Sequence, residues 1–325
     1  MTDYAMVTPA PGGPDSFERR PWDPGRPGPG EVLLRHTAIG LNFIDIYHRS
    51  GFYPWPVERD LVVGSEAAGV IEAVGEGVPG LSVGDRVAYT LPMGAYVSAR
   101  VVPADRLVPI PDAISDEVAA TLMLKGLTAH YLIHDCIALR PGMHVLVHAA
   151  AGGVGSLLGQ WLTAKGAVAI GTAGGPAKVA LAREHGYAHV IDYRTEDFPA
   201  VVAEITDGRG VGAVLDGVAG TTWRGSLAAL GVRGAYVCFG QAAGPVTGFA
   251  LSDLAGKSLS AARPVLFHYI AEPAELRARA RDLFAAVAAG EIRSHPRQRV
   301  ALAEVAQAHA ALEGRATTGA TVLIP

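Results

Sequence analysis

The stretch His148-Ala149-Ala150-Ala151-Gly152-Gly153-Val154-Gly155 lies between a short apolar segment, residues 144–147, and a longer apolar segment that extends to Lys165. The first segment predicts a strand and the second predicts a helix. In the G-x-G-x-x-G fingerprint, glycines allow a tight turn, close approach of a pyrophosphate to backbone N–H groups, and close packing of the helix on the strand. Ala150 replaces the first glycine here, and Gly152 and Gly155 keep the other two positions. The stretch therefore predicts a dinucleotide-binding turn, with an ordinary strand-to-helix turn as the alternative.

Strands and helices continue to alternate after this turn. Strands are predicted at 167–172, 188–191, 211–216 and 235–239, and helices at 176–185, 198–206 and 221–230. This alternation predicts an α/β fold, in which a doubly wound parallel sheet is covered on both faces. Ligands of such sheets bind past the carboxyl ends of the strands, which places residues 172–174, 216–218 and 239–241 around the ligand.

The end of the second strand indicates which nicotinamide cofactor is bound. NAD sites normally carry an Asp or Glu there, which holds the ribose 2′-hydroxyl. This chain has Thr172-Ala173-Gly174-Gly175 instead, and Lys178 follows in the next helix. A carboxylate would repel a 2′-phosphate, so its absence, together with the lysine, favours NADPH. The alternative is that Lys178 is only a solvated helix residue.

Composition favours a soluble enzyme of two domains, because 325 residues exceed the usual size of one core. The chain is 50% hydrophobic and 18% charged, with a net charge of −4 and no basic block, so nucleic acid and anionic membranes are poor candidates as partners. No segment has the length of a membrane span, and the N-terminal region lacks a signal-peptide core. Cys136 and Cys238 are too few for a disulfide framework and are expected to be buried small hydrophobes.

The two ends of the chain have a different predicted secondary structure from its middle. Short strands are predicted at 31–36, 68–74, 85–89 and 95–98, separated by Gly and Pro, and no long helix is expected before Ser115. Helices are predicted at 273–289 and 302–312, with a charged stretch between them, followed by a strand at 320–324. The N-terminal part is therefore expected to be β-rich. The last strand suits the sheet edge of either domain.

Six motifs distributed over nearly the whole chain resemble those of the zinc-free quinone oxidoreductases, a zeta-crystallin-like family of the medium-chain dehydrogenase/reductase superfamily. They are 40–47 (GLNFIDIY), 64–69 (GSEAAG), 84–87 (GDRV), 124–128 (LKGLT), 148–155 and 315–319 (RATTG). The resemblance implies a GroES-like catalytic domain at 1–121, a Rossmann NADPH-binding domain at 122–261, and a segment at 262–325 that returns to the catalytic domain. It also implies a cytoplasmic homodimer that reduces quinones with NADPH.

The resemblance further implies that no zinc is used. Zinc-dependent relatives carry a Cys where Asn42 stands and a His where Ser65 stands, and they insert a lobe of four Cys that this chain lacks. A catalytic zinc needs three ligands from Cys, His or carboxylate groups, and the motif positions offer an amide and a hydroxyl. Reduction is then expected to proceed by direct hydride transfer from the nicotinamide.

Site residues are carried over by motif position. Beside the acceptor and the nicotinamide, the resemblance implies catalytic roles for Asn42, Tyr47, Tyr53, Lys125 and Thr128, although Tyr47 and Tyr53 suit plain packing equally well. The residues implied for the cofactor are Ala151, Gly152, Gly153, Val154, Gly174, Lys178, Tyr193, Val218, Phe239, Gly240, Gln241, Arg263 and Arg315. Gln241 departs from the smaller residue of close relatives.

The leading hypothesis is an NADPH:quinone oxidoreductase. Two alternatives stay open: an NADPH-dependent reductase of activated C=C bonds in enones or enoyl compounds, and a non-catalytic NADPH-binding protein. The apolar strand near Tyr236–Phe239 suits either a subunit-facing edge or the core.

Overall fold

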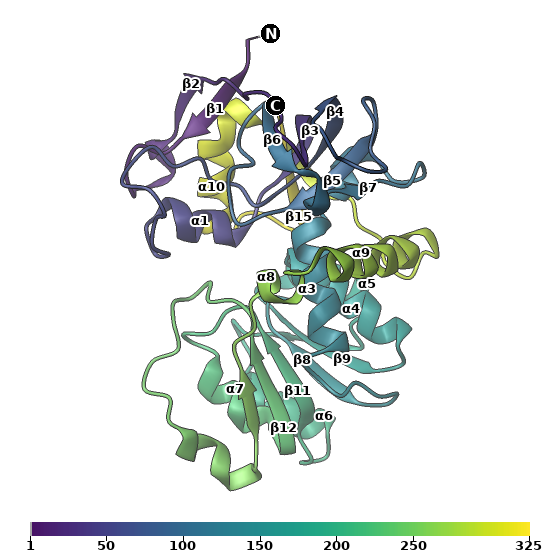
Figure 1. Cartoon of the computed structure of the whole chain (residues 1–325). Coiled ribbons are helices and arrows are strands. Elements are labelled where there is room, and N and C mark those ends of the chain that lie inside the picture. The colour runs from purple at the N-terminus through teal and green to yellow at the C-terminus, as the bar shows by residue number, and fades with distance from the viewer. Residues whose placement is uncertain (1) are drawn as a thin grey trace. The chain divides into compact units, whose positions relative to one another are not determined.

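The computed structural model describes residues 2–325 and divides them into two compact units, each shown in Figure 1. Unit 1 comprises the chain up to Lys125 together with residues 270–288 and 294–325, and unit 2 comprises residues 126–269 and 289–293. Within residues 2–325, no helix is both long and apolar enough to cross a membrane.

Unit 2 is built on one sheet of six parallel strands. In sheet order these are β10 (His189–Asp192), β9 (Val168–Ala173), β8 (His144–Val147), β11 (Val211–Asp216), β12 (Leu230–Cys238) and β13 (Ser260–Ala262). This order reverses direction at β8, the strand that precedes the glycine-rich turn. The doubly wound parallel sheet predicted from the sequence is confirmed, and the turn lies at the topological switch point where such sheets bind ligands.

Helices cover both faces of this sheet (Figure 1). They are α4 (Gly153–Ala164), α5 (Pro176–Glu184), α6 (Phe198–Ile205) and α7 (Trp223–Ala229), followed by the 3₁₀ segment η3 (Leu251–Lys257) and α8 (Leu266–Tyr269). The predictions of α4 to α7 are confirmed. The helix α3 (Met123–His134) was not predicted, because nearly all of its residues are buried and no polar face produces a helical period.

The strand near Tyr236–Phe239 is an interior strand. β12 pairs with β11 on one side and with β13 on the other, and Tyr236 and Cys238 pack in the core of the unit. Core burial therefore explains its apolar sequence, and the interpretation of this strand as an edge is wrong. The edge strand on this side of the sheet is β13, whose three residues are exposed. Cys136, expected to be buried, is only partly so, whereas Cys238 is buried.

Unit 1 is β-rich, as predicted. Its main sheet has the order β14 (Pro296–Ala301), β15 (Ala320–Ile324), β3 (Glu31–Gly40), β4 (Glu66–Val74), β5 (Arg86–Thr90) and β7 (Val108–Pro109), and β6 (Ala99–Pro103) also pairs with β3. A separate antiparallel pair consists of β1 (Tyr4–Val7) and β2 (Glu18–Pro21). The last strand, left open by the sequence, pairs with β14 and β3 and so belongs to unit 1.

The helices of unit 1 are short except for the last two. They are α1 (Phe43–Arg49), α2 (Asp116–Ala120), α9 (Pro273–Ala288) and α10 (Val305–Glu313), with 3₁₀ segments η1 (Pro14–Ser16), η2 (Ala104–Arg106) and η4 (Leu302–Glu304). The predictions of α9 and of the helix around 302–312 are confirmed. The strand β14 was not predicted, because its alternating polar residues resemble a charged stretch.

The predicted strand at 95–98 is wrong. Ala95 and Tyr96 donate backbone hydrogen bonds to Gly64 and Val63, outside the main ladder, and the strand β6 begins at Ala99. All four residues are nonetheless buried, which produced the apolar signal.

Buried neutral histidines make unit 1 sensitive to acid. Burial lowers the pKa of His36 and of His309 to about 3. An unfolded chain protonates these groups near pH 6.5 and the folded chain does not, so they lower the stability as pH falls below about 6.5. The carboxyl of Asp45 has the opposite effect on stability. Its pKa in the folded chain is raised to about 7, so its contribution to the free energy of unfolding falls as pH rises from about 4 to 7.

On unfolding in this range, the two histidines bind more protons than the one carboxyl releases. We therefore expect the free energy of unfolding to rise by about 1 kcal/mol per pH unit between pH 4.5 and 6.5. Urea unfolding across this range measures the slope. Replacing His36 by Gln should flatten it, and a slope of the opposite sign would contradict the assignment of neutral histidines.

Candidate active site

Asn42 stands at the start of α1 and is almost fully buried. Its backbone is extended, with φ of −139° and ψ of 157°, and its N–H donates to Asp45 Oδ2 at 2.9 Å. The carboxylate of the third helical residue thus holds the residue that precedes the helix, a common way to fix a helix N-terminus. As a result, the backbone that carries the Asn42 side chain is rigid.

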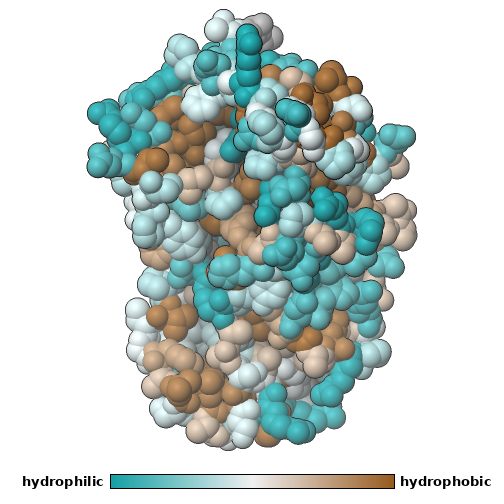
Figure 2. Space-filling model, in the orientation of Figure 1, coloured by the Kyte–Doolittle hydropathy of each residue, from teal (hydrophilic) through white to brown (hydrophobic). Residues whose placement is uncertain are grey.

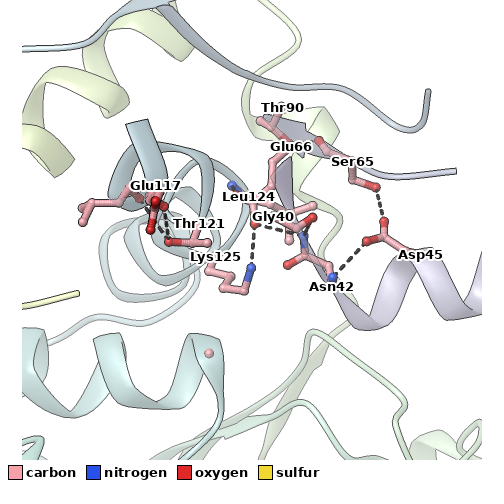
Figure 3. Close-up of polar contacts among 12 residues, drawn as sticks. Gly40, Asn42, Asp45, Ser65, Glu66, Thr90, Glu117, Thr121, Leu124 and Lys125 are labelled. Carbon is pink, nitrogen blue, oxygen red and sulfur yellow. Dashed lines mark hydrogen bonds and ion pairs between the residues drawn. The ribbon is translucent and has the colours of Figure 1, made fainter. Parts of the chain in front are cut away.

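Glu66, the first residue of β4, gathers the side chains of Asn42 and Lys125 (Figure 3). Its Oε1 accepts from Asn42 Nδ2 at 2.9 Å and from Lys125 Nζ at 2.6 Å, and its Oε2 accepts from the Leu124 N–H at 2.6 Å. The Glu66 side chain is fully buried and that of Lys125 is 7% exposed. One buried carboxylate therefore forms an ion pair with the lysine ammonium and orients the asparagine amide.

Asp45 anchors a second group of buried polar side chains. Its Oδ1 accepts from Ser65 Oγ and its Oδ2 from Tyr96 Oη, each at 3.0 Å. Burial raises the pKa of this carboxyl to about 7, while these hydrogen bonds and the Asn42 N–H act to lower it. The Ser65 hydroxyl is also within 3.0 Å of the Pro92 carbonyl.

Aromatic rings gather along and after α1. Tyr47 lies 5.2 Å from Tyr53 and 5.4 Å from Phe52 between ring centroids, and Phe52 stacks on Tyr53 at 5.7 Å with an interplanar angle of 29°. Phe43 adjoins Tyr47 at 6.3 Å. We call Phe43, Tyr47, Phe52 and Tyr53 the aromatic wall. The Tyr53 N–H donates to the Tyr47 carbonyl, which closes the loop, and Phe52 remains 44% exposed.

The glycine-rich turn of unit 2 has the geometry of a dinucleotide cradle. Gly152 is the N-cap of α4, so the N–H groups of the first turn point out of the helix end. A Cβ on Gly155 would lie 2.3 Å from the Ala149 carbonyl oxygen, so only glycine allows this packing of α4 on the turn. Ala149 itself has φ of 56°. These features fit a pyrophosphate at the helix N-terminus.

The end of β9 carries no acidic residue, as the sequence indicates. Tyr193 follows β10, and a Cβ added to Gly174 would lie 2.4 Å from the Tyr193 hydroxyl, so that hydroxyl lies over the backbone at the end of β9. Lys178 is in the first turn of α5. One carboxylate is near: Asp192 Oδ1 accepts from the N–H groups of Gly175 and Arg194 at 3.0 and 3.1 Å.

The loops after β11 and β12 lie against each other. A Cβ on Gly240 would lie 2.7 Å from the Gly217 carbonyl oxygen, and one on Gly217 would lie 3.0 Å from the Phe239 ring. Asp216 Oδ1 accepts from the Val218 N–H at 2.8 Å and fixes the start of this loop. The other predicted residues of this unit are Ala151 in the turn, Gly153 and Val154 at the start of α4, Thr128 in α3, Gln241 after Gly240, and Arg263 after β13.

Arg315 occupies an unusual backbone position in unit 1. Its N–H donates to the Leu312 carbonyl and the Ala316 N–H donates to the Ala311 carbonyl, which forms a Schellman motif at the end of α10. Arg315 has φ of 55° at the position where glycine is usual, which costs a side chain roughly 1 kcal/mol.

Sequence reasoning missed Glu66 and Asp45 as parts of the site. Both lie inside motifs that the resemblance rests on, yet neither was singled out. The sequence did contain a signal for Glu66, namely a carboxylate among small and apolar neighbours. Glu66 follows Gly64-Ser65 and precedes Ala67-Ala68. This segment is too apolar for a solvated strand.

Two family models match the chain. The alcohol dehydrogenase GroES-like domain matches residues 28–112, and the zinc-binding dehydrogenase model matches residues 153–284. A quinone oxidoreductase of Pseudomonas aeruginosa is 49% identical over 316 residues, which are 97% of each chain. The chain belongs to the quinone oxidoreductase family. This family is a zeta-crystallin-like branch of the medium-chain dehydrogenase/reductase superfamily, so the predicted family and fold class are confirmed.

Other members of the family differ in their named substrates. A 2-haloacrylate reductase of Burkholderia is 44% identical, with 97% of this chain and 96% of the relative covered. The solved structure of Escherichia coli quinone oxidoreductase complexed with NADPH is 40% identical, covers 99% of this chain and all of its own, and has a TM-score of 0.94.

Proposed function

We propose that this protein is an NADPH:quinone oxidoreductase that works without zinc. The observation that carries the proposal is the buried set of Asn42, Glu66 and Lys125, which adjoins α1 and its aromatic wall. The wall offers flat apolar surface to a ring, and the lysine offers positive charge. Such a combination suits an acceptor whose oxygen becomes negative as it is reduced.

Within this set, Lys125 is the donor toward the acceptor. Asn42 Nδ2 already donates to Glu66 and, at 3.4 Å, to the Gly40 carbonyl, so this amide nitrogen is engaged within the protein. The Lys125 ammonium has three N–H groups and gives one to Glu66. Lys125 therefore stabilises the developing oxyanion, and Asn42 helps to hold the Glu66 carboxylate that positions the lysine.

Unit 2 supplies the cofactor residues of the proposal. Ala151, Gly152, Gly153 and Val154 would hold the pyrophosphate, Gly174, Lys178 and Tyr193 the adenosine phosphate, and Val218, Phe239, Gly240, Gln241 and Arg263 the nicotinamide half, beside Thr128. The family resemblance also assigns Arg315 to cofactor binding. When bound, NADPH supplies the hydride.

The proposal that no zinc is needed rests on the hydrogen bonds of Asn42 and Ser65. The Asn42 amide is held by Glu66 and the Ser65 hydroxyl by Asp45 and Pro92, so both side chains have hydrogen-bonding roles in the protein. An amide and a hydroxyl are poor zinc ligands beside thiolate and imidazole. We therefore propose that chelators leave the activity unchanged.

We expect Phe52→Ala to raise the KM for a naphthoquinone about three- to tenfold, because it removes one stacked ring from the aromatic wall. The KM for a small acceptor without a ring, such as 2-chloroacrylate, should change less than twofold. Phe249→Ala is a matched control, because Phe249 is a comparably exposed aromatic of unit 2. Equal effects on both acceptors would argue against the wall as the quinone site.

The second candidate is reduction of an activated C=C bond, and the 44% identity to a 2-haloacrylate reductase favours it. The same polar set would serve, since an oxyanion also develops when an enone or acrylate accepts a hydride. Turnover of 2-chloroacrylate with no turnover of any quinone would select this function.

We also propose a homodimer in the cytoplasm. The exposed edge strand β13 and the exposed side chains of Val232, Leu251 and Val265 in unit 2 suit a subunit contact. Figure 2 shows apolar surface gathered over the part of this unit where the β12–β13 connection runs in Figure 1. Two free cysteines suit a reducing compartment. Sedimentation velocity tests the dimer against the 33.7 kDa monomer.

A further inference from the structure

His148 lies between β8 and the glycine-rich turn, and its side chain is almost completely buried. Its backbone N–H donates to the Leu215 carbonyl and so extends the β8–β11 pairing by one residue. The ring meets Phe198 edge-on, with 4.9 Å between centroids. The imidazole thus lies under the turn, within unit 2.

Both ring nitrogens of His148 are bonded to buried hydroxyls. Nδ1 is 2.9 Å from Thr172 Oγ1, near the end of β9, and Nε2 is 2.9 Å from Ser226 Oγ, in α7. The Ser226 hydroxyl donates to the Thr222 carbonyl, so it accepts from Nε2–H, and Nδ1 accepts from the Thr172 hydroxyl. Burial lowers the pKa of His148, which keeps this neutral tautomer.

The hydrogen bonds continue from Ser226 to the next loop. Thr222, whose carbonyl accepts from Ser226, donates its own hydroxyl to Asp216 Oδ2 at 2.7 Å. Asp216 Oδ1 in turn accepts from the Val218 and Ala219 N–H groups. One connected network therefore joins the carboxyl ends of β8, β9 and β11, where a doubly wound sheet binds its ligand.

The turn beside His148 tolerates little movement. Ala149 is held in the left-handed region, with φ of 56°, and the Ala150 N–H donates to the Thr172 carbonyl at 2.9 Å. The contact of Gly155 with the Ala149 carbonyl leaves no room for a Cβ. A shift of Thr172 or of the turn would therefore displace the N–H groups at the start of α4.

We propose that His148 is a positioning residue for the phosphate-binding turn, holding Thr172 and Ser226 so that the N–H groups of α4 are pre-organised for the cofactor pyrophosphate. This inference rests on the proposed NADPH-dependent function. The proposed role needs no contact between His148 and the cofactor.

The test is the dissociation constant of NADPH, measured by fluorescence on the full chain. Thr172→Val removes one hydroxyl at nearly constant volume and should raise the Kd about three- to tenfold, from the loss of one buried hydrogen bond. His148→Leu should raise it about tenfold or more. His148→Gln, whose amide nitrogen replaces Nε2, should recover part of the affinity. The KM for the quinone at saturating NADPH should change less than twofold.

Val202→Ala is the control for a purely structural effect. Val202 is fully buried in α6 of the same unit, so this variant loses stability without touching the network. If it weakens NADPH binding as much as Thr172→Val, or if Thr172→Val and His148→Leu bind NADPH like the native protein, the positioning role is overturned. Failure of the native protein to bind NADPH would overturn the proposed function itself.

Discussion

Replacing Lys125 by Met should lower the free energy of unfolding by about 3–5 kcal/mol, because it leaves the Glu66 carboxylate buried without its cation. Asn42 Nδ2 and the Leu124 N–H would remain as hydrogen-bond donors to that carboxylate, but neither carries a charge. Quinone reduction should fall together with stability, since the substitution also removes the proposed oxyanion donor. Urea unfolding measures the first effect and steady-state kinetics the second.

A double-mutant cycle separates charge from packing. Adding Glu66→Gln to Lys125→Met removes the unpaired charge, so the double variant should be more stable than Lys125→Met alone. The exposed pair of Arg209 and Asp207 is the matched control, and Arg209→Met should cost less than about 1 kcal/mol. If the losses in free energy of unfolding of the two single variants add up to that of the double variant, Glu66 and Lys125 do not stabilise the fold as a pair.

Lys178→Gln should raise the KM for NADPH about ten- to a hundredfold and leave the KM for NADH within twofold. The physical reason is the loss of a charge-assisted hydrogen bond to the 2′-phosphate, worth roughly 1.5–3 kcal/mol. NADH has no such phosphate, so it provides an internal reference. Both constants are measured with the same quinone at saturation.

The matched control for this variant is Arg183→Gln, which removes a positive charge from the last turn of the same helix α5. If Arg183→Gln shifts the NADPH constant as strongly, the effect of Lys178 reflects the general field of the helix. If neither variant changes the preference for NADPH over NADH, Lys178 does not bind the 2′-phosphate. Arg315 is then the first residue to replace.

The Rossmann part of the fold could be predicted because its signals are local. Glycines at 152 and 155, Pro176 at the start of a helix and Gly186 after its end act over a few residues, and the structure places α4 and α5 accordingly. α3 escaped detection because a helix buried on nearly every side has no polar face to produce a period.

The candidate site was predictable only in part, because its connections are long-range. Asn42, Glu66 and Lys125 are far apart in sequence and meet through one carboxylate, a juxtaposition that no local pattern encodes. Likewise, β14 and β15 join the sheet of β3 from the other end of the chain. Family motifs indicated Asn42 and Lys125, but the role of Glu66 became visible only from the contacts.

The decisive measurement for zinc-independent quinone reduction is the oxidation of NADPH and of NADH by the purified, chelator-treated protein with a naphthoquinone as acceptor. We expect rapid oxidation of NADPH that resists the chelator, with a clear preference over NADH. Loss of activity on chelation, a preference for NADH, or no oxidation with any quinone would contradict it.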